Sequence, residues 1–118
     1  MAGLNNAAMT IGADAMKAVM QFAQLHSAAA GVAGTSNVCS GPRKAITWSP
    51  TTGAGDFGLG AQINFTGGAA GGPVFSVTTW SASTGGTIYG EFIMSGDAAF
   101  NGLGEYSVTA LNLDGSAS

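Results

Sequence analysis

The chain carries few side chains that could begin a reaction. His26 and Cys39 are the only residues of their types among 118. Nucleophilic catalysis needs a nucleophile, a base and a group that orients the base. The six carboxylates are scattered too widely to suggest a glycosidase pair or a metal cage: Asp14, Asp56, Glu91, Asp97, Glu105 and Asp114. We therefore expect no catalytic residue, no bound metal, no cofactor and no enzymatic activity.

One glycine-rich stretch formally matches a nucleotide-binding pattern. The sequence GAGDFG at 53–58 has the spacing GxGxxG, with glycines at Gly53, Gly55 and Gly58. That motif holds a pyrophosphate only where a strand precedes it and a helix N-terminus follows it. The residues that follow here alternate like a strand. We therefore interpret the stretch as a hairpin-type loop.

The remaining chemistry is aromatic. The stretch TTWSASTGGTIYGEFIM at 78–94 places Trp80 and Tyr89 in two strand-like runs that a glycine turn joins. If exposed, these rings could stack on sugars; if buried, they supply apolar area that alanine and glycine cannot. They could also be neighbours across a hairpin. We favour the structural interpretation, with glycan stacking at Trp80 and Tyr89 as the alternative.

The charge content is unusually low and limits the partners of the chain. Charged residues make up 8% of the sequence, whereas about 25% is usual. Three basic residues and a net charge of −3 exclude a nucleic-acid-binding face. A single cysteine excludes an internal disulfide. A surface of small polar and apolar residues suits packing against copies or a scaffold, although a small neutral monomer is the alternative.

The sequence also bears on where the protein is made. A basic leader before an apolar stretch is not evident, so we predict no secretion signal and synthesis in a cytoplasm. A run of about 18 apolar residues is also lacking, so we predict no membrane insertion.

We expect a single domain over 1–118 that opens with a helix over 4–20, capped by Asn5 or Asn6. The helix is apolar over more than half of its circumference. Either it is buried in a small domain, or one flank faces its own sheet and the other faces a neighbour, as we prefer. The candidate assembly residues are Met9, Ile11, Ala13, Ala15, Met16, Ala18 and Met20. Met16→Lys or Ala18→Glu should then disrupt assembly, and Lys17→Glu should be nearly neutral.

The rest of the chain reads as short strands separated by glycine-rich turns. Segments 44–48, 59–65, 74–80, 87–94 and 105–113 are strand-like, and 21–27 fits a helix or a strand. Residues 27–42 and 49–58 are predicted loops, and 114–118 a frayed tail. The spacing predicts a mainly β fold: an antiparallel, jelly-roll-like β-sandwich over 21–113 with one N-terminal helix.

Three segments resemble a known family. RKAITW at 43–48, WSASTGGTIYG at 80–90 and YSVTALNL at 106–113 are similar to small tail fibre-like or minor tail proteins of actinobacterial tailed phages. Family members have a strand ending in Leu-His-Thr, for which Leu25, His26 and Ser27 stand here. The resemblance implies a strand at 21–27 and a virion setting. The chain departs from the family at SAAAGVAG, where an acidic residue and a proline are common.

The resemblance implies a non-enzymatic structural protein of the virion, of the minor tail or fibre type. A capsid decoration protein is the alternative, and a receptor- or glycan-binding module is the second alternative. The implied partners are copies of the chain, other virion proteins of the tail or major capsid, and, for the binding module, a host cell-surface glycan. We expect a homotrimer, because fibres and capsid three-fold decorations favour that symmetry.

Overall fold

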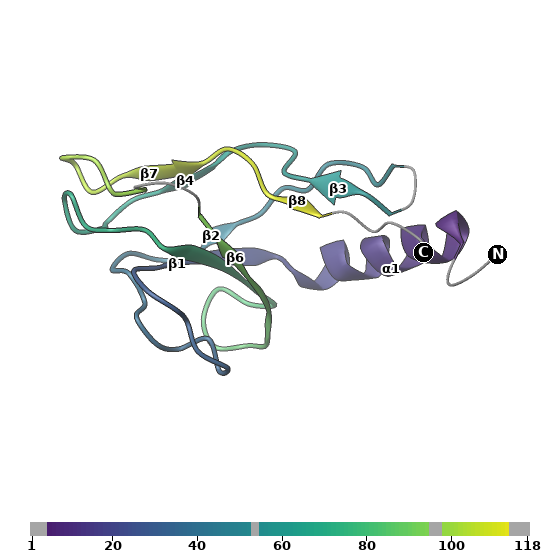
Figure 1. Ribbon diagram of the computed structural model, residues 1–118, viewed down its shortest axis with the longest axis horizontal. Coiled ribbons are helices and arrows are strands. Elements are labelled where there is room, and N and C mark those ends of the chain that lie inside the picture. The colour runs from purple at the N-terminus through teal and green to yellow at the C-terminus, as the bar shows by residue number, and fades with distance from the viewer. Residues whose placement is uncertain (1–4, 53–54, 95–97, 114–118) are drawn as a thin grey trace.

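The computed structural model of the protein describes residues 5–52, 55–94 and 98–113 (Figure 1). As the sequence predicted, the fold is mainly β, with antiparallel sheets and one N-terminal helix. The elements in chain order are α1 Asn6–Val19, β1 Phe22–His26, β2 Lys44–Ala45, β3 Phe57–Gly58, β4 Ile63–Phe65, β5 Ser76–Trp80, β6 Ile88–Ile93, β7 Tyr106–Val108 and β8 Asn112–Leu113.

The helix α1 begins and ends close to the predicted positions. The Asn5 side chain accepts a hydrogen bond from the Ala8 backbone N–H at 2.9 Å, as an N-cap residue should. Met20 follows the last turn as the C-cap, and its N–H donates to the Met16 carbonyl. The chain then enters β1 directly, so the strand interpretation of 21–27 is confirmed.

The main sheet has four antiparallel strands in the order β2-β1-β5-β6. A second antiparallel pair, β4 and β7, covers one face of this sheet, because residues of both layers form one buried cluster. That cluster contains Ala23, Leu25, Ile63, Phe65, Val74, Val77, Phe100, Val108 and Leu111. The two layers are compatible with the predicted sandwich.

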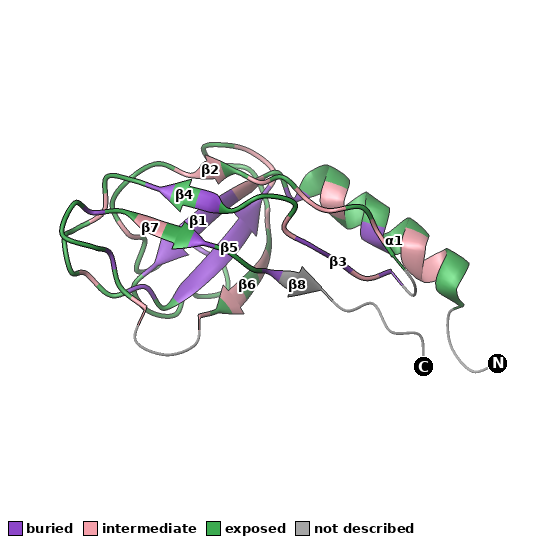
Figure 2. Ribbon diagram, turned by 90° about the horizontal axis from the view of Figure 1, so that it is seen from above, coloured by how far each residue is buried: buried purple, intermediate pink, exposed green. Residues whose placement is uncertain are grey.

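The loop at 27–43 covers much of the opposite face of the main sheet. Ala30 in this loop is fully buried, and Gly34 lies so close that a side chain there would meet Trp80 and Ile88. Every residue of β5 is therefore buried (Figure 2). This double cover explains why the stretch at 74–80 lacks the polar alternation of a half-exposed strand.

Several predicted boundaries are wrong. The segment 44–48 forms only the two-residue β2, and 105–113 divides into β7 and β8. The predicted loop at 49–58 contains β3, which pairs with β8. Thr52 and Asp56 form an antiparallel bridge, so the hairpin interpretation of the glycine motif is confirmed. Gly53, Asp97, Asp114 and the predicted tail at 114–118 lie outside the described residues.

The molecule is elongated, with extents of 50 × 24 × 21 Å. Its radius of gyration is 15.0 Å, whereas about 13.5 Å is expected for a compact domain of this length. Helix α1 and the β3–β8 pair extend together from one end of the main sheet (Figures 1 and 2). The helix therefore packs on a narrow arm of the protein.

Candidate functional site

One flank of α1 packs on its own chain. Ala13 and Met20 are 1% and 3% exposed and form a small core with Phe57 of β3. The Trp48 indole donates to the Met20 carbonyl at 2.8 Å and meets the Phe57 ring edge-on at 5.1 Å. The prediction that Ala13 and Met20 contact another subunit is therefore wrong, because both side chains fill this intramolecular core.

A glycine of the nucleotide-like motif makes this packing possible. Gly55 is buried with a φ of +89°, and a Cβ at this position would lie 2.5 Å from the Met9 carbonyl oxygen. Only glycine accepts both the left-handed backbone and this close approach. The motif therefore lets the hairpin rest on the backbone of α1, and partly buried Met9 lies on this inner side.

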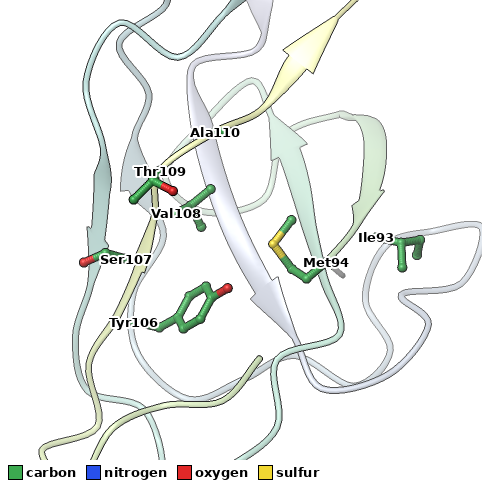
Figure 3. Close-up of a pocket in the computed structure, with 7 residues that line it drawn as sticks. All are labelled: Ile93, Met94, Tyr106, Ser107, Val108, Thr109 and Ala110. Atoms are coloured by element: carbon green, nitrogen blue, oxygen red, sulfur yellow. The ribbon is translucent and has the colours of Figure 1, made fainter. Parts of the chain in front are cut away.

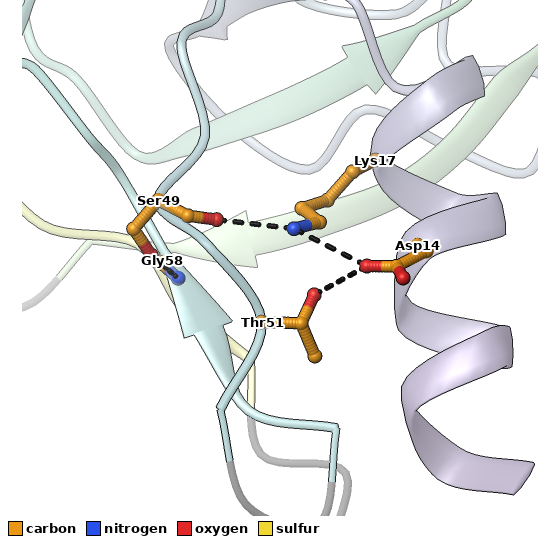
Figure 4. Close-up of polar contacts among 5 residues, drawn as sticks. All are labelled: Asp14, Lys17, Ser49, Thr51 and Gly58. Atoms are coloured by element: carbon orange, nitrogen blue, oxygen red, sulfur yellow. Dashed lines mark hydrogen bonds and ion pairs between the residues drawn. The ribbon is translucent and has the colours of Figure 1, made fainter. Parts of the chain in front are cut away.

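The charged residues of α1 also contact its own chain (Figure 4). The Lys17 ammonium donates to the Ser49 carbonyl at 3.2 Å, pairs with Asp14 at 3.4 Å and lies 5.6 Å from the centre of the Phe57 ring. The Thr51 hydroxyl donates to Asp14 at 2.7 Å. This bond, with a smaller contribution from Lys17, lowers the pKa of Asp14. Lys17 is thus held by the chain's own hairpin, and near-neutrality of Lys17→Glu for assembly stays a prediction.

The opposite flank of α1 has apolar side chains in solvent. We define the outer flank as Ile11, Gly12, Ala15, Ala18 and Val19, which are all exposed. The Ile11 side chain is the most exposed of these large hydrophobic groups, at 71%. Met16, at 42%, lies at the border of the flank. Of the predicted assembly residues, Ile11, Ala15, Met16 and Ala18 thus remain accessible to a neighbour.

The two candidate stacking aromatics do not form a site together. Trp80 is 4% exposed, and the Arg43 guanidinium covers its ring at 3.9 Å. Its indole N–H donates to the Thr78 hydroxyl at 2.7 Å. A register shift beside Trp80 pairs it with Ile88, and Tyr89 is 46% exposed. Trp80 as a stacking platform is therefore wrong, and the structural interpretation of this residue is confirmed.

Arg43 joins two of the segments that carry the family resemblance. Besides covering Trp80, its guanidinium donates to the carbonyls of Ala82 and Gly85 at 2.8 and 2.7 Å. Desolvation lowers the pKa of Arg43. The sequence does not single out Arg43 for this role, although an arginine in one segment and a tryptophan followed by a glycine turn in another suggest such a contact. The segments at 43–48 and 80–90 thus share a structural contact.

His26 is fully buried and both of its ring nitrogens have partners. The Ser36 carbonyl lies 2.9 Å from Nδ1, and a carbonyl only accepts, so Nδ1 carries the proton. In the neutral ring, Nε2 then accepts from the Thr78 hydroxyl at 2.8 Å. The hydrogen bonds run in one direction from Trp80 through Thr78 and His26 to Ser36. This arrangement assigns the histidine a structural role.

Glu91 on β6 also holds the covering loop. Its carboxylate accepts from the Ser76 hydroxyl at 2.6 Å and from the Ala30 N–H at 2.9 Å. These two bonds lower the pKa of Glu91. Cys39 is half-buried, and burial raises the pKa of its thiol. A thiol with a raised pKa is a poor nucleophile at neutral pH.

Two surface depressions lie beside β7. The first has a volume of about 280 Å³ and no charged residue in its lining (Figure 3); it is formed by Ile93, Met94, Tyr106, Ser107, Val108, Thr109 and Ala110. The second has about 220 Å³ and is lined by Asn64, Phe65, Thr66, Asn101, Glu105, Tyr106 and Ser107. Histidine and cysteine are lacking in both linings, so neither depression pairs a strong nucleophile with a base.

Within residues 5–52, 55–94 and 98–113, histidine, cysteine and carboxylate side chains do not gather in threes as a metal site would need. Helix α1, the helix in that part of the chain, is too short to cross a bilayer. Comparison with family models, curated proteins and solved structures finds no match to the chain.

Proposed function

We propose that the protein is a non-enzymatic structural subunit of a tailed-phage virion, of the minor tail or fibre type. It assembles through self-association and through docking on other proteins of the particle. The observation that carries the proposal is the outer flank of α1, where Ile11 and Val19 lie in solvent. A helix on a monomeric domain normally turns its apolar stripe to the core and its charges to water.

The distribution of charge on α1 makes this flank unusual. Lys17 and Asp14 reach Ser49 and Thr51 of the chain's own hairpin, and the side chain of Lys17 is only 18% exposed. The side of the helix that faces away from the hairpin has Ile, Gly, Ala and Val instead. Exposed apolar surface of this kind costs solubility unless another molecule covers it. A subunit that functions in an assembly is the simplest protein with this arrangement.

The composition and the family resemblance support the same proposal. A surface built for a free monomer has about 25–35% charged residues, and this whole chain has 8%. The resemblance supplies the phage setting. Its segments at 43–48 and 80–90 meet at Arg43 and Trp80 in structural contacts, as expected for a family that shares a fold. We propose this structural role without a catalytic activity.

Quantitative mass spectrometry of purified phage particles tests the proposal. We expect the chain in the particle at a few to a few tens of copies, judged against the major capsid protein. Hundreds of copies would instead indicate the capsid decoration protein. Absence from particles whose infected host cells contain the chain would refute the virion role altogether. The burial of Trp80 weakens the glycan-binding alternative, since its proposed pair of stacking rings does not form.

A further inference from the structure

We propose that Asn101 is a site of self-modification, at which the backbone nitrogen of Gly102 attacks the side-chain amide carbon of Asn101 and releases ammonia. The product is a five-membered succinimide ring, which water opens to aspartate or isoaspartate. The loop between Phe100 and β7 contains this site. The reaction is a property of the folded chain and does not depend on the proposed virion role.

The residue that follows Asn101 favours this reaction. Among the asparagines of the chain, Asn101 alone is followed by glycine. A side chain on the following residue would hinder the approach of its nitrogen, whereas glycine has no Cβ and its backbone turns freely. The residues that follow the other asparagines are Asn6, Ala7, Val38, Phe65 and Leu113. Asn101 is therefore the asparagine at which the attack meets the least steric hindrance.

The folded loop brings the two reacting groups into one small ring. The Asn101 Oδ1 atom accepts from the Leu103 N–H at 2.9 Å, and the ring that this bond closes contains both the Asn101 Cγ and the Gly102 nitrogen. Asn101 and Gly102 are both exposed, so water reaches them. Among the described residues, the Gly102 N–H has no hydrogen-bond partner. The attacking nitrogen therefore breaks no hydrogen bond of the fold when it gives up its proton.

Two backbone donors stabilise the charge that the attack creates. Besides Leu103, the Glu105 N–H donates to Asn101 Oδ1, also at 2.9 Å. Attack on Cγ turns this oxygen into an oxyanion, and donors already placed around a developing oxyanion lower the barrier. The Asn101 Nδ2 group, which leaves as ammonia, donates to the Glu105 carboxylate at 3.3 Å. The loop thus holds both ends of the amide in a fixed orientation.

The reaction needs water as its one reagent and involves neither oxidation nor reduction. A bond forms between the Gly102 nitrogen and the Asn101 Cγ, the Cγ–Nδ2 bond breaks, and the Gly102 proton leaves with the amide NH₂ group as ammonia. Water then adds to one of the two carbonyls of the ring. Opening at Cγ gives aspartate, and opening at the main-chain carbonyl gives isoaspartate.

Both products change this loop and the second depression, which Asn101 and Glu105 help to line. A carboxylate in place of the amide faces Glu105 where Nδ2 now donates, so two like charges repel at short range. Isoaspartate also routes the backbone through an extra carbon. The carbonyl that accepts from the Gly104 N–H at 3.1 Å then leaves the main chain. We therefore expect the modified protein to unfold at a lower temperature than the unmodified protein.

Peptide mapping by mass spectrometry tests the site after incubation of the purified protein at mildly alkaline pH. We expect the products to form at least about tenfold faster at Asn101 than at Asn37, which is also exposed in a loop but precedes Val38. Gly102→Ala is the matched control, because a Cβ there meets nothing within 4 Å. This variant should fold as the parent does and lose most of the reaction. Equal rates at Asn101 in parent and variant would overturn the proposal, as would equal rates at Asn101 and Asn37.

The same measurement in urea tests the contribution of the fold. The unfolded chain keeps the Asn-Gly sequence but loses the fixed donors from Leu103 and Glu105. We expect the reaction at Asn101 to be faster in the folded protein than in urea at the same pH, and the reaction at Asn37 not to be. An equal or slower reaction at Asn101 in the folded protein would show that the turn does not promote the attack, and the assigned role of the two donors would be wrong.

Discussion

Two adjacent threonines of β5 allow a matched test of the buried hydrogen-bond network. Thr78 and Thr79 are both fully buried in the same strand. The Thr78 hydroxyl contacts the Trp80 indole at 2.7 Å and His26 Nε2 at 2.8 Å. The Thr79 hydroxyl is the buried polar side-chain atom that lacks a hydrogen-bond partner in the described part of the chain. Substituting each by valine replaces a hydroxyl by a methyl group of similar shape.

The two substitutions should change the free energy of unfolding in opposite directions. Thr78→Val leaves a donor on Trp80 and an acceptor on His26 without partners in the interior. Each such group costs about 1–3 kcal/mol, so we expect a loss of about 3 kcal/mol. Thr79→Val removes an unpaired buried hydroxyl and breaks no bond. We expect it to stabilise the protein by about 1 kcal/mol.

Thermal unfolding followed by far-UV circular dichroism measures the difference. For a chain of this length, 1 kcal/mol corresponds to a shift of about 3–6 °C in Tm, so the two variants should differ by more than about 10 °C. Strand propensity cancels, because the substitution and the strand are the same. Thr78→Ser, which keeps the hydroxyl, should recover most of the loss. Shifts of equal sign and size for the two valine variants would refute the assigned hydrogen bonds.

Three further outcomes are expected. The pKa of Glu91 is lowered in the folded protein, so its stabilising contribution is present above the unfolded value near 4.5 and is lost as the pH falls through the lower folded value. The Tm difference between the parent and Glu91→Gln should therefore shrink on acidification. A Tm difference that stays constant would contradict this. Gly55→Ala should lower the free energy of unfolding by about 2 kcal/mol or more in urea, because a Cβ would meet the Met9 carbonyl as well as strain the backbone. Gly71 also has a positive φ, of +72°, but has open space around it, so Gly71→Ala measures the backbone strain alone. Arg43→Ala should increase acrylamide quenching of tryptophan fluorescence, since the guanidinium covers one indole ring; unchanged quenching would show that the ring stays shielded without it.

The sequence by itself determined the elements whose signals are local. The asparagine cap and the helix-forming residues after it predicted α1, and alternation with glycine turns predicted a mainly β fold with antiparallel strands. The hairpin interpretation of GAGDFG was also correct, because the residues that follow it alternate like a strand. These features depend on contacts within a few residues, so composition and periodicity were enough to predict them.

Only the tertiary structure decided which face of each element is covered. Periodicity divides α1 into two apolar flanks, but the position of Phe57 and Trp48, far along the chain, makes the flank with Ala13 the inner one. Likewise, Trp80 is buried because Arg43 lies over its ring and the loop at Gly34 packs against it. The short β3 exists only because β8 pairs with it. Burial of a face depends on which distant segment packs against it, and local sequence does not specify that partner.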